Sequence, residues 1–527
     1  MSATSQGTAS EWMWRYPECR LLISAVGTAL AFPPISVWWL LFGMPALWLR
    51  VLQDTPRRQR IWYAFIWGTV FITAQSWWAL PTLSQQAQVE WVAGVAWVVC
   101  IVWYASWCVL FGWLVRYLPN EGIGWTVGVA LSWVGISWLR SLGNWGFPWA
   151  MMSLPLARYP LFLQPAELGG IWLVELLLML WNALLAQAIQ QRQWFAFLTP
   201  TAVLILWIGS SNWLLWQARL STPTATVRVA AIQPEYEGQK VLFSEKLYED
   251  NLRRLLQQAQ QMRARWAVLP ESSETYFWSE SNAPQRIRSW QQLAQNLDMR
   301  ILIGVSRRLG EVGYNSAMAI APASLPVFYN KVKLMPFTEY APPPPVGEWL
   351  QVLGVARRSL QIGTHPHAIR LYGEPPVGTL ICYESLFGWV GAKQVRDGAQ
   401  WLVAMTNDQW LLGAGVREQH ADYCVLRAIE TRRWVVRAST VGPTGFFSPL
   451  GERRTVPIGR PEVAAYTIEC FSGMTLYSRW GDFFGYGSLL VFASILLWGR
   501  LGIPRYPVSM RSYTNRAAKV HKNEYAR

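Results

Sequence analysis

The chain has 527 residues, of which 52% are hydrophobic and only 15% are charged. Because soluble proteins carry about a quarter charged residues, this composition indicates a membrane protein with two or more domains. The net charge of +15 could suggest nucleic-acid binding, but Lys and Arg flank apolar segments or lie in the C-terminal tail. We therefore expect them to orient the chain in an anionic bilayer, with no nucleic-acid partner. The four His have no metal-ligand spacing, so no structural zinc site is expected.

Residues 1–220 are nearly continuous apolar stretches with short breaks, which predicts a helical membrane domain of seven spans. The first two stretches are shorter than the ~20 residues of a span and are separated by Phe32-Pro33-Pro34, so we interpret them as a pair. An eighth span is expected within residues 476–504, followed by a basic tail at 505–527. The expected helices lie at Leu21–Phe32, Ser36–Val51, Ile61–Leu80, Val89–Leu118, Ile123–Leu142, Ala166–Gln190, Trp194–Trp216 and Phe483–Leu501.

The placement of Lys and Arg predicts the orientation of these spans, because basic loops stay in the cytoplasm. Basic residues precede the first helix, separate the second from the third and the sixth from the seventh, end the fourth, and fill the tail. This pattern puts both termini in the cytoplasm and, after seven spans, the following residues outside. Arg140 and Arg158 depart from the pattern, because they fall on the outer side.

An aromatic, Pro-interrupted segment at residues 143–165 separates two of the spans and contains Phe147 and Trp149. Aromatic residues between spans commonly form an interfacial belt, and the sequence favours that interpretation. The alternative is a loop that dips into the outer leaflet beside an active site.

From Thr222 the composition changes, and residues 221–475 alternate β-leaning runs with polar helical runs. Such alternation indicates a layered α/β domain held between membrane helices. The expected strands are Val227–Gln233, Trp266–Leu269, Arg300–Gly304, Asn315–Ile320, Val327–Tyr329, Thr379–Ile381, Trp401–Met405 and Trp434–Ala438. The expected helices are Ser244–Arg265, Arg286–Leu297, Val390–Asp397 and Glu418–Thr431.

Three reactive side chains follow expected strands: Glu271, Lys331 and Cys382. Each has an ordinary interpretation, because cysteines are often buried in cores and charged residues at strand ends are usually solvated. Together they supply a set for covalent catalysis: a thiol nucleophile, a carboxylate base and an ammonium that stabilises an oxyanion. The backbone N–H of Tyr383 is the expected second oxyanion donor.

Three segments around these residues resemble the signature segments of the nitrilase superfamily, and two later segments resemble its further blocks. With seven spans before them and one after, the whole chain resembles the apolipoprotein N-acyltransferase family, a membrane-embedded branch of that superfamily. The segments are Leu269-Pro270-Glu271, Tyr329-x-Lys331-x-x-Leu334-x-Pro336-Phe337-x-Glu339-Tyr340, Ile381-Cys382-Tyr383-Glu384, Thr406-Asn407-Asp408-x-Trp410 and Arg427-Ala428-Ile429-Glu430.

This resemblance implies an α-β-β-α sandwich on the periplasmic side of a bacterial inner membrane. It implies that Glu271 is the general base, Lys331 the transition-state stabiliser and Cys382 the nucleophile. Glu339 matches an additional active-site glutamate, and Tyr383 and Glu384 match positions that the family needs around the nucleophile.

The implied reaction is ping-pong and needs no cofactor or metal. Cys382 takes the sn-1 acyl chain of a phospholipid, typically phosphatidylethanolamine, as a thioester. The thioester then acylates the α-amino group of the diacylglyceryl-cysteine of an apolipoprotein, the last step of lipoprotein maturation. We expect a monomer.

Two aromatic segments are candidates for loops that contact lipid, Tyr276-Phe277-Trp278 and Trp410-Leu411-Leu412, with core aromatics as the alternative interpretation. Thr338 stands where the family often has Gly, and a Pro run at 342–345 follows Ala341. These departures affect the expected loop geometry and leave the three catalytic candidates in place.

Two other functions are alternatives for the same sequence features. A membrane-tethered amidase of the nitrilase type would use the same three residues and let water resolve the acyl-enzyme. A transporter with a degenerate enzyme domain would lack one of the three, and none is lacking; Glu175 is the candidate intramembrane charge for that function.

Overall fold

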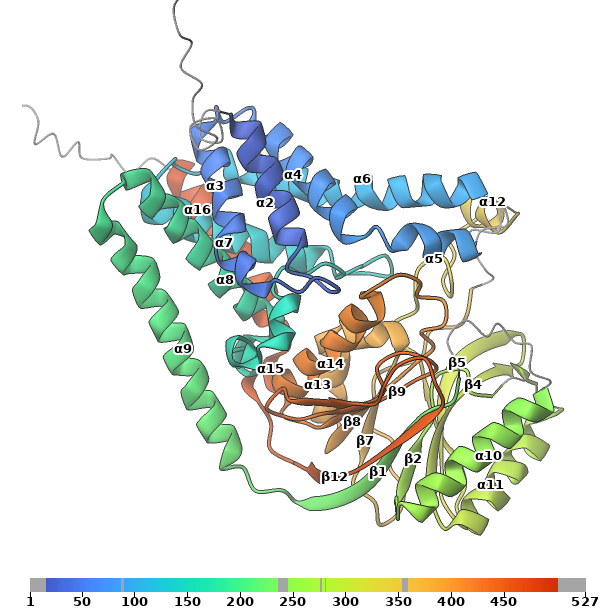
Figure 1. Cartoon of the computed structure of the whole chain (residues 1–527). Coiled ribbons are helices and arrows are strands. Elements are labelled where there is room, and N and C mark those ends of the chain that lie inside the picture. The colour runs from blue at the N-terminus through green and yellow to red at the C-terminus, as the bar shows by residue number, and fades with distance from the viewer. Residues whose placement is uncertain are drawn as a thin grey trace, which may run out of the picture.

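In the computed structural model of the chain, residues 16–86, 90–235, 245–274, 277–279, 281–352 and 359–500 are described. The tail at 505–527 and Tyr276 lie outside the described residues. A bundle of helices occupies one end of the molecule and two β-sheets occupy the other (Figure 1). Helix α9 runs down one side of the molecule and leads from the bundle into the first strand (Figure 1).

The helices of the bundle lie close to their predicted positions. The predicted helix Ile61–Leu80 is divided, because α4 ends at Gln75 and a separate helix, α5, begins at Ala79. A short 3-10 helix, Trp38–Phe42, precedes α3 where the second predicted helix was expected to begin. The bundle helices are α2 Pro17–Ala29, α3 Met44–Asp54, α4 Arg60–Gln75, α5 Ala79–Gln86, α6 Glu90–Val115, α7 Gly122–Leu139, α8 Ala166–Gln191, α9 Leu198–Arg219 and α16 Phe483–Arg500.

Four helices of the described part of the chain are long and apolar enough to cross a membrane. They cover Trp91–Val115, Gly122–Leu139, Ala166–Gln191 and Trp194–Arg219. Helix α16 adds a shorter apolar stretch, Phe483–Leu497. The count of eight spans therefore stays a prediction.

The strands of the described residues form two sheets. The first has the order β12-β1-β2-β4-β5-β6, with β3 paired to β4, and the second has the order β11-β10-β9-β8-β7. The first sheet contains β1 Ala225–Gln233, β2 Trp266–Val268, β3 Phe277–Trp278, β4 Arg300–Leu309, β5 Val312–Ile320, β6 Val327–Asn330 and β12 Glu462–Cys470. The second contains β7 Val377–Ile381, β8 Trp401–Thr406, β9 Val435–Ser439, β10 Gly445–Phe447 and β11 Arg453–Thr455.

Side-chain alternation along the strands explains why the sheets stack. On β1, Val227, Val229 and Ala231 enter one core, whereas Ala230 and Ile232 enter another. Because successive side chains point to opposite faces, a strand that is apolar at every position is buried on both sides. Each sheet must therefore be covered on two faces.

The covering layers follow from the core contacts. The core between the sheets joins Val229 and Leu302 of the first sheet to Val403 and Val436 of the second. Helices α10 (Glu245–Gln261) and α11 (Ala283–Leu297) cover the outer face of the first sheet (Figure 1). Helices α13 (Gly388–Arg396) and α14 (Val416–Thr431) cover the second sheet and pack on the bundle. The layers therefore run helix, sheet, sheet, helix, with the bundle against the last layer.

The strands that the sequence did not predict are β3, β10, β11 and β12. Strand β12 pairs with β1 from Ala225–Cys470 to Gln233–Glu462, which extends the first sheet at an edge. The short helices α12 (Val346–Val352) and α15 (Leu476–Trp480) were also not predicted.

The core between the sheets should dominate the stability of the layered domain. Leu302 on β4 is fully buried there, whereas Leu309 at the end of the same strand is 45% exposed. We expect Leu302→Ala to lower the free energy of unfolding by about 2–5 kcal/mol, because it leaves a cavity. Leu309→Ala is the matched control and should change the melting temperature in detergent little. Equal melting temperatures for the two variants would contradict this assignment of the core.

Candidate active site

Three strand ends bring the predicted catalytic residues together. Glu271 follows β2, Lys331 follows β6 directly, and Cys382 follows β7 directly. Strands β2 and β6 run in the same direction within the first sheet, and β7 belongs to the facing sheet. The site therefore lies where the ends of strands from both sheets meet.

Lys331 lies between two carboxylates. Its Nζ is 3.3 Å from Glu271 Oε1 and 2.8 Å from Glu339 Oε2, and all three side chains are buried. Burial alone would lower the pKa of Lys331, but the charges of Glu271 and Glu339 more than offset it and raise the pKa above its ordinary value. Lys331 is therefore a fixed ammonium at neutral pH.

Glu271 is held by further donors. Asn315 Nδ2 donates at 2.7 Å to Glu271 Oε1 and at 2.7 Å to Glu339 Oε1. The backbone N–H of Asn407 donates at 3.0 Å to Glu271 Oε2. A buried carboxylate with several donors on fixed backbone and side-chain positions is confined to one orientation.

Cys382 begins a tight turn in a backbone conformation that non-glycine residues rarely adopt. Its φ is 50°, and it is the first residue of the 3-10 helix Cys382–Leu386. Residues in this left-handed region cost free energy and persist where the surrounding structure holds them. The N–H groups of the first turn of a helix lack intrahelical acceptors, so that of Tyr383 is a suitable oxyanion donor.

Glu384 anchors this turn to the lysine segment. It accepts hydrogen bonds from the backbone N–H groups of Ile381 at 2.8 Å and Val332 at 2.6 Å, and from the Tyr329 hydroxyl at 2.9 Å. The Lys333 N–H donates to it at 3.2 Å. Burial raises the pKa of Glu384 to about 7. Glu384 thus joins the nucleophile segment to the segment that carries Lys331, and all of its contacts are structural.

The Cys382 thiol is held neutral at rest. Burial raises the pKa of the thiol well above its ordinary value, and the negative charge of Glu271 adds to this, while Lys331 opposes it. A neutral thiol is a weak nucleophile, so attack requires a base that removes the proton as the reaction proceeds. Among the surrounding groups, Glu271 is the carboxylate whose charge acts most strongly on the thiol.

The aromatic loop at residues 143–165 packs against the turn Cys382–Leu386, which we call the nucleophile turn because it carries the predicted nucleophile. The Phe147 ring stacks on the Tyr383 ring, with 6.0 Å between the ring centroids. The Tyr383 hydroxyl donates to the Gly146 carbonyl at 2.6 Å. The ring centroid of Trp149 is 6.3 Å from that of His420. Phe147 and Trp149 therefore lie beside the site, as the interpretation that the sequence favoured less expects, and the entry of this loop into the outer leaflet stays a prediction.

The two remaining aromatic candidates differ. Trp410 is half-buried and lies three residues beyond Asn407, which donates to Glu271. Trp278 is only 1% exposed and packs in the core between the first sheet and helices α10 and α11. The structure thus places Trp410 near the site but makes Trp278 a core residue, contrary to the expectation of a lipid-contacting loop there.

Sequence reasoning missed two residues that shape the site, Asn315 and Arg140. Asn315 lies in the middle of an ordinary strand, and only the pairing of β5 with β6 brings it to Lys331. Arg140, noted for its unexpected outer position, donates to the carbonyls of Trp149 at 2.5 Å and Phe147 at 3.2 Å. The unusual position of Arg140 was therefore the signal that could have revealed its role in holding the loop.

Glu175 also holds this loop. Its carboxylate accepts from the Ser153 N–H at 2.6 Å and from Trp133 Nε1 at 2.7 Å. These two donors satisfy hydrogen-bond acceptors of the Glu175 carboxylate and give Glu175 a structural role in holding the loop.

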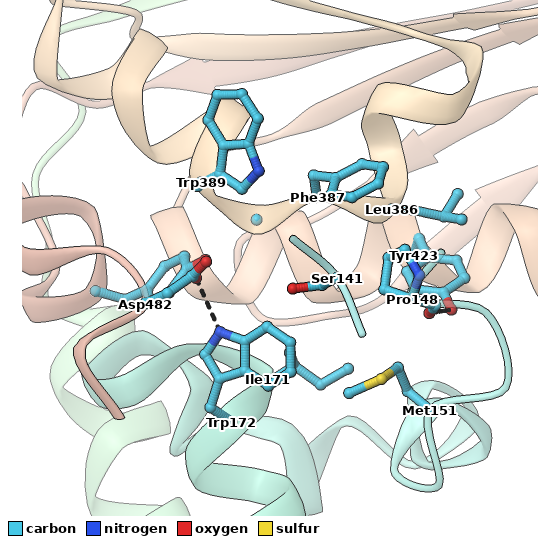
Figure 2. A pocket seen from close by; sticks show the side chains of 12 residues that line it. Ser141, Pro148, Met151, Ile171, Trp172, Leu386, Phe387, Trp389, Tyr423 and Asp482 are labelled. Atoms are coloured by element: carbon cyan, nitrogen blue, oxygen red, sulfur yellow. Dashed lines mark hydrogen bonds between the residues drawn. The ribbon is translucent and has the colours of Figure 1, made fainter. Parts of the chain in front are cut away.

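A small pocket marks the junction beneath the nucleophile turn. Leu386 and Phe387 of the turn lie on one side of it, and Ile171 and Trp172 of α8 lie on the other (Figure 2). Trp172 Nε1 donates at 2.8 Å to Asp482 (Figure 2). The turn is therefore supported directly by the bundle. In the described part of the chain, no group of three or more His, Cys, Asp or Glu could hold a metal ion.

Two family models match the chain. Residues 24–184 match the apolipoprotein N-acyltransferase N-terminal domain, and residues 228–463 match the carbon-nitrogen hydrolase family. The apolipoprotein N-acyltransferase of Chromobacterium violaceum is 29% identical over 500 residues, covering 90% of this chain and 93% of that protein. The protein of the same name from Geobacter metallireducens is 26% identical over 490 residues, covering 88% and 92%. A solved amidase from Nesterenkonia sp. is similar over 48% of this chain and 94% of its own, with 14% identity and a TM-score of 0.37.

The raised pKa of Cys382 gives a direct pH test. If the thiol titrates well above 9, the thiolate fraction rises about tenfold for each pH unit between pH 7 and pH 9. We expect the rate of alkylation by iodoacetamide, measured on the Cys382 peptide by mass spectrometry, to rise with that slope and no plateau. An alkylation rate independent of pH in this range would show a preformed thiolate and contradict the raised pKa of the Cys382 thiol.

Proposed function

We propose that the chain, which is similar to apolipoprotein N-acyltransferases over most of its length, carries out lipoprotein N-acylation through a thioester on Cys382. The observation that carries this proposal is the position of the thiol at a strand end, under the opposed charges of Glu271 and Lys331. The enzyme is an acyltransferase, and its substrates are a phospholipid and a lipoprotein. Phosphatidylethanolamine as donor and the diacylglyceryl-cysteine amine as acceptor are the finer part of the proposal.

In the first half-reaction Glu271 removes the proton of the Cys382 thiol as the sulfur attacks the sn-1 ester carbonyl of the phospholipid. The developing oxyanion is stabilised by the Lys331 ammonium and the N–H of Tyr383. When the C–O bond breaks, Glu271 returns the proton to the departing alkoxide. The products are a lysophospholipid and an acyl group joined to Cys382 as a thioester.

In the second half-reaction the lipoprotein amine attacks the thioester carbonyl. Glu271 accepts the proton of the amine, the same two donors stabilise the second oxyanion, and the C–S bond breaks. The proton passes to the sulfur, so the thiol is regenerated and an amide is formed. A thioester has enough acyl-transfer potential to form this amide without a further energy source.

The protein is a bacterial membrane protein, because its relatives of this family are bacterial and its described part contains four helices of membrane-spanning character. We place it in the inner membrane as a monomer, with the catalytic domain of residues 221–475 on the periplasmic side. Support comes from the distribution of basic residues and from the loop with Phe147 and Trp149, which joins the bundle to the nucleophile turn. Lipid substrates anchored in the outer leaflet can then reach Cys382.

Intact-protein mass spectrometry tests the first half-reaction. Purified protein in detergent, incubated with phosphatidylethanolamine, should gain the mass of one acyl chain, and hydroxylamine should remove it. Cys382→Ala should gain nothing. Folded wild-type protein that acquires no adduct, or an adduct that persists in Cys382→Ala, would refute the proposed intermediate.

Gly304 provides a test of the proposed base in which none of the proposed catalytic residues is itself substituted. A Cβ at Gly304 would lie 2.5 Å from the Cα of Glu271, so Gly304→Ala must displace that backbone. Because misplacement of a catalytic group by about 1 Å can cost about a hundredfold in rate, we expect thioester formation to slow by about 10–100-fold. Gly473→Ala, where a Cβ meets nothing within 4 Å, is the matched control. Equal rates in the two variants would show that the position of Glu271 does not limit the reaction.

A further inference from the structure

A second buried network lies behind the nucleophile and has no part in the mechanism above. His420 Nε2 is 3.3 Å from the carbonyl oxygen of Cys382 and 3.1 Å from Ser385 Oγ. The other ring nitrogen, Nδ1, is 3.0 Å from Asp408 Oδ1. The side chains of His420, Asp408 and Ser385 are all buried.

Asp408 is a fixed anion. Its Oδ1 accepts from Thr406 Oγ1 at 3.0 Å, and its Oδ2 accepts from Arg437 Nη2 at 2.7 Å and Ser439 Oγ at 2.8 Å. Burial alone would raise the pKa of Asp408, but Arg437 and His420 more than offset it and lower the pKa. A Cβ at Gly442 would lie 2.1 Å from Asp408 Oδ2, so this position has room only for glycine.

The charge of Asp408 fixes the orientation of the histidine. An ionised carboxylate can only accept hydrogen bonds, so Nδ1 of His420 carries a hydrogen and donates it to Asp408. Arg437 Nη2 lies 3.4 Å from the same nitrogen, but its shorter contact is the one to Asp408. Nε2 is thereby directed at the nucleophile turn.

At the turn, His420 and Ser385 act on one carbonyl. Ser385 Oγ donates its one hydrogen to the carbonyl oxygen of Cys382 at 2.8 Å. Both oxygens near His420 Nε2 can then only accept, so Nε2 carries a hydrogen as well as Nδ1 and donates to the Cys382 carbonyl and to Ser385 Oγ. The imidazole, the hydroxyl and the carbonyl form one continuous unit. This unit supports the turn at Cys382, whose φ of 50° needs such support.

The same loop serves the base. Asp408 follows Asn407, whose N–H donates at 3.0 Å to Glu271 Oε2. One short segment after β8 therefore orients the carboxylate base through Asn407 and the nucleophile turn through Asp408 and His420. A shift of this segment would move both reacting groups.

We propose that His420, oriented by Asp408, is a positioning residue that holds the Cys382 carbonyl and so aims the thiol at the acyl carbonyl of the substrate. This inference rests on the proposed role of Cys382 as nucleophile. In the proposed reaction, His420 contacts neither the thiol proton nor the substrate. It therefore affects the rate of attack by the thiol and not the binding of the substrate.

Three substitutions test the contacts of the two ring nitrogens of His420 separately. In His420→Gln the amide nitrogen corresponds to Nε2 and can still reach the Cys382 carbonyl. In His420→Asn it corresponds to Nδ1, so only the contact with Asp408 is kept, and His420→Phe fills the space with neither contact. His365→Asn, at an exposed histidine of the same domain, is the control.

We expect thioester formation from phosphatidylethanolamine in a single turnover to slow by about 10–100-fold in His420→Asn and His420→Phe, with KM unchanged. His420→Gln should recover most of the rate, and His365→Asn should match the wild type. Alkylation of Cys382 by iodoacetamide should follow the same order, because it reports the turn without any lipid.

Wild-type rates in His420→Asn and His420→Phe would overturn the inference. It would also be overturned if all three variants lost rate equally and in proportion to their loss of melting temperature, since that result marks a purely structural histidine. If the wild type itself forms no thioester, the proposed function fails, and the order of the alkylation rates still decides the role of His420.

Discussion

The arrangement of the site depends on one buried ammonium. An unpaired lysine in a protein interior costs several kcal/mol, so Lys331 can be buried only where carboxylates surround it. Glu271 and Glu339 provide them from two separate segments, and Asn315 joins those carboxylates from a third. The requirement to satisfy one charge thus brings β2, β5, β6 and the segment after β6 to a single point. Glu271, the proposed base, and Lys331, the proposed oxyanion-stabilising cation, are positioned by the same set of contacts.

Cys382, the proposed nucleophile, comes from the other sheet and needs its own support. Glu384 ties the turn at Cys382 to the lysine segment through Val332, and Tyr383 ties it to the aromatic loop of the bundle. The loop is in turn held by Arg140 and Glu175. A continuous path of hydrogen bonds therefore runs from the helical bundle to the nucleophile. Such a path gives a physical reason for a membrane bundle and a soluble type of fold to be joined in one chain.

Much of this could be predicted from the sequence because the relevant signals are local. Apolar runs gave the helices, short β-leaning runs gave the strands, and Glu271, Lys331 and Cys382 each follow a strand. The structure brings these three together, and their chemical roles stay a proposal. Contacts between distant segments were not predictable in this way. Asn315 lies on an unremarkable strand, and Trp278 looked the same as a loop aromatic until its burial was known. The aromatic loop was assigned to the membrane interface because nothing in its sequence indicates its contact with Tyr383.

In the proposed reaction, the acyl group on Cys382 passes to an amine and not to water. The most direct measurement is the fate of a preformed acyl-enzyme, freed of phospholipid and divided between buffer and a peptide with an amino-terminal diacylglyceryl-cysteine. We expect the thioester to persist in buffer and to discharge to the peptide, with the acyl chain recovered as an amide on the α-amino group. An N-acetylated form of the same peptide should not discharge it. Loss of the thioester at the same rate with and without peptide, with free fatty acid as the product, would identify a hydrolase and contradict the account.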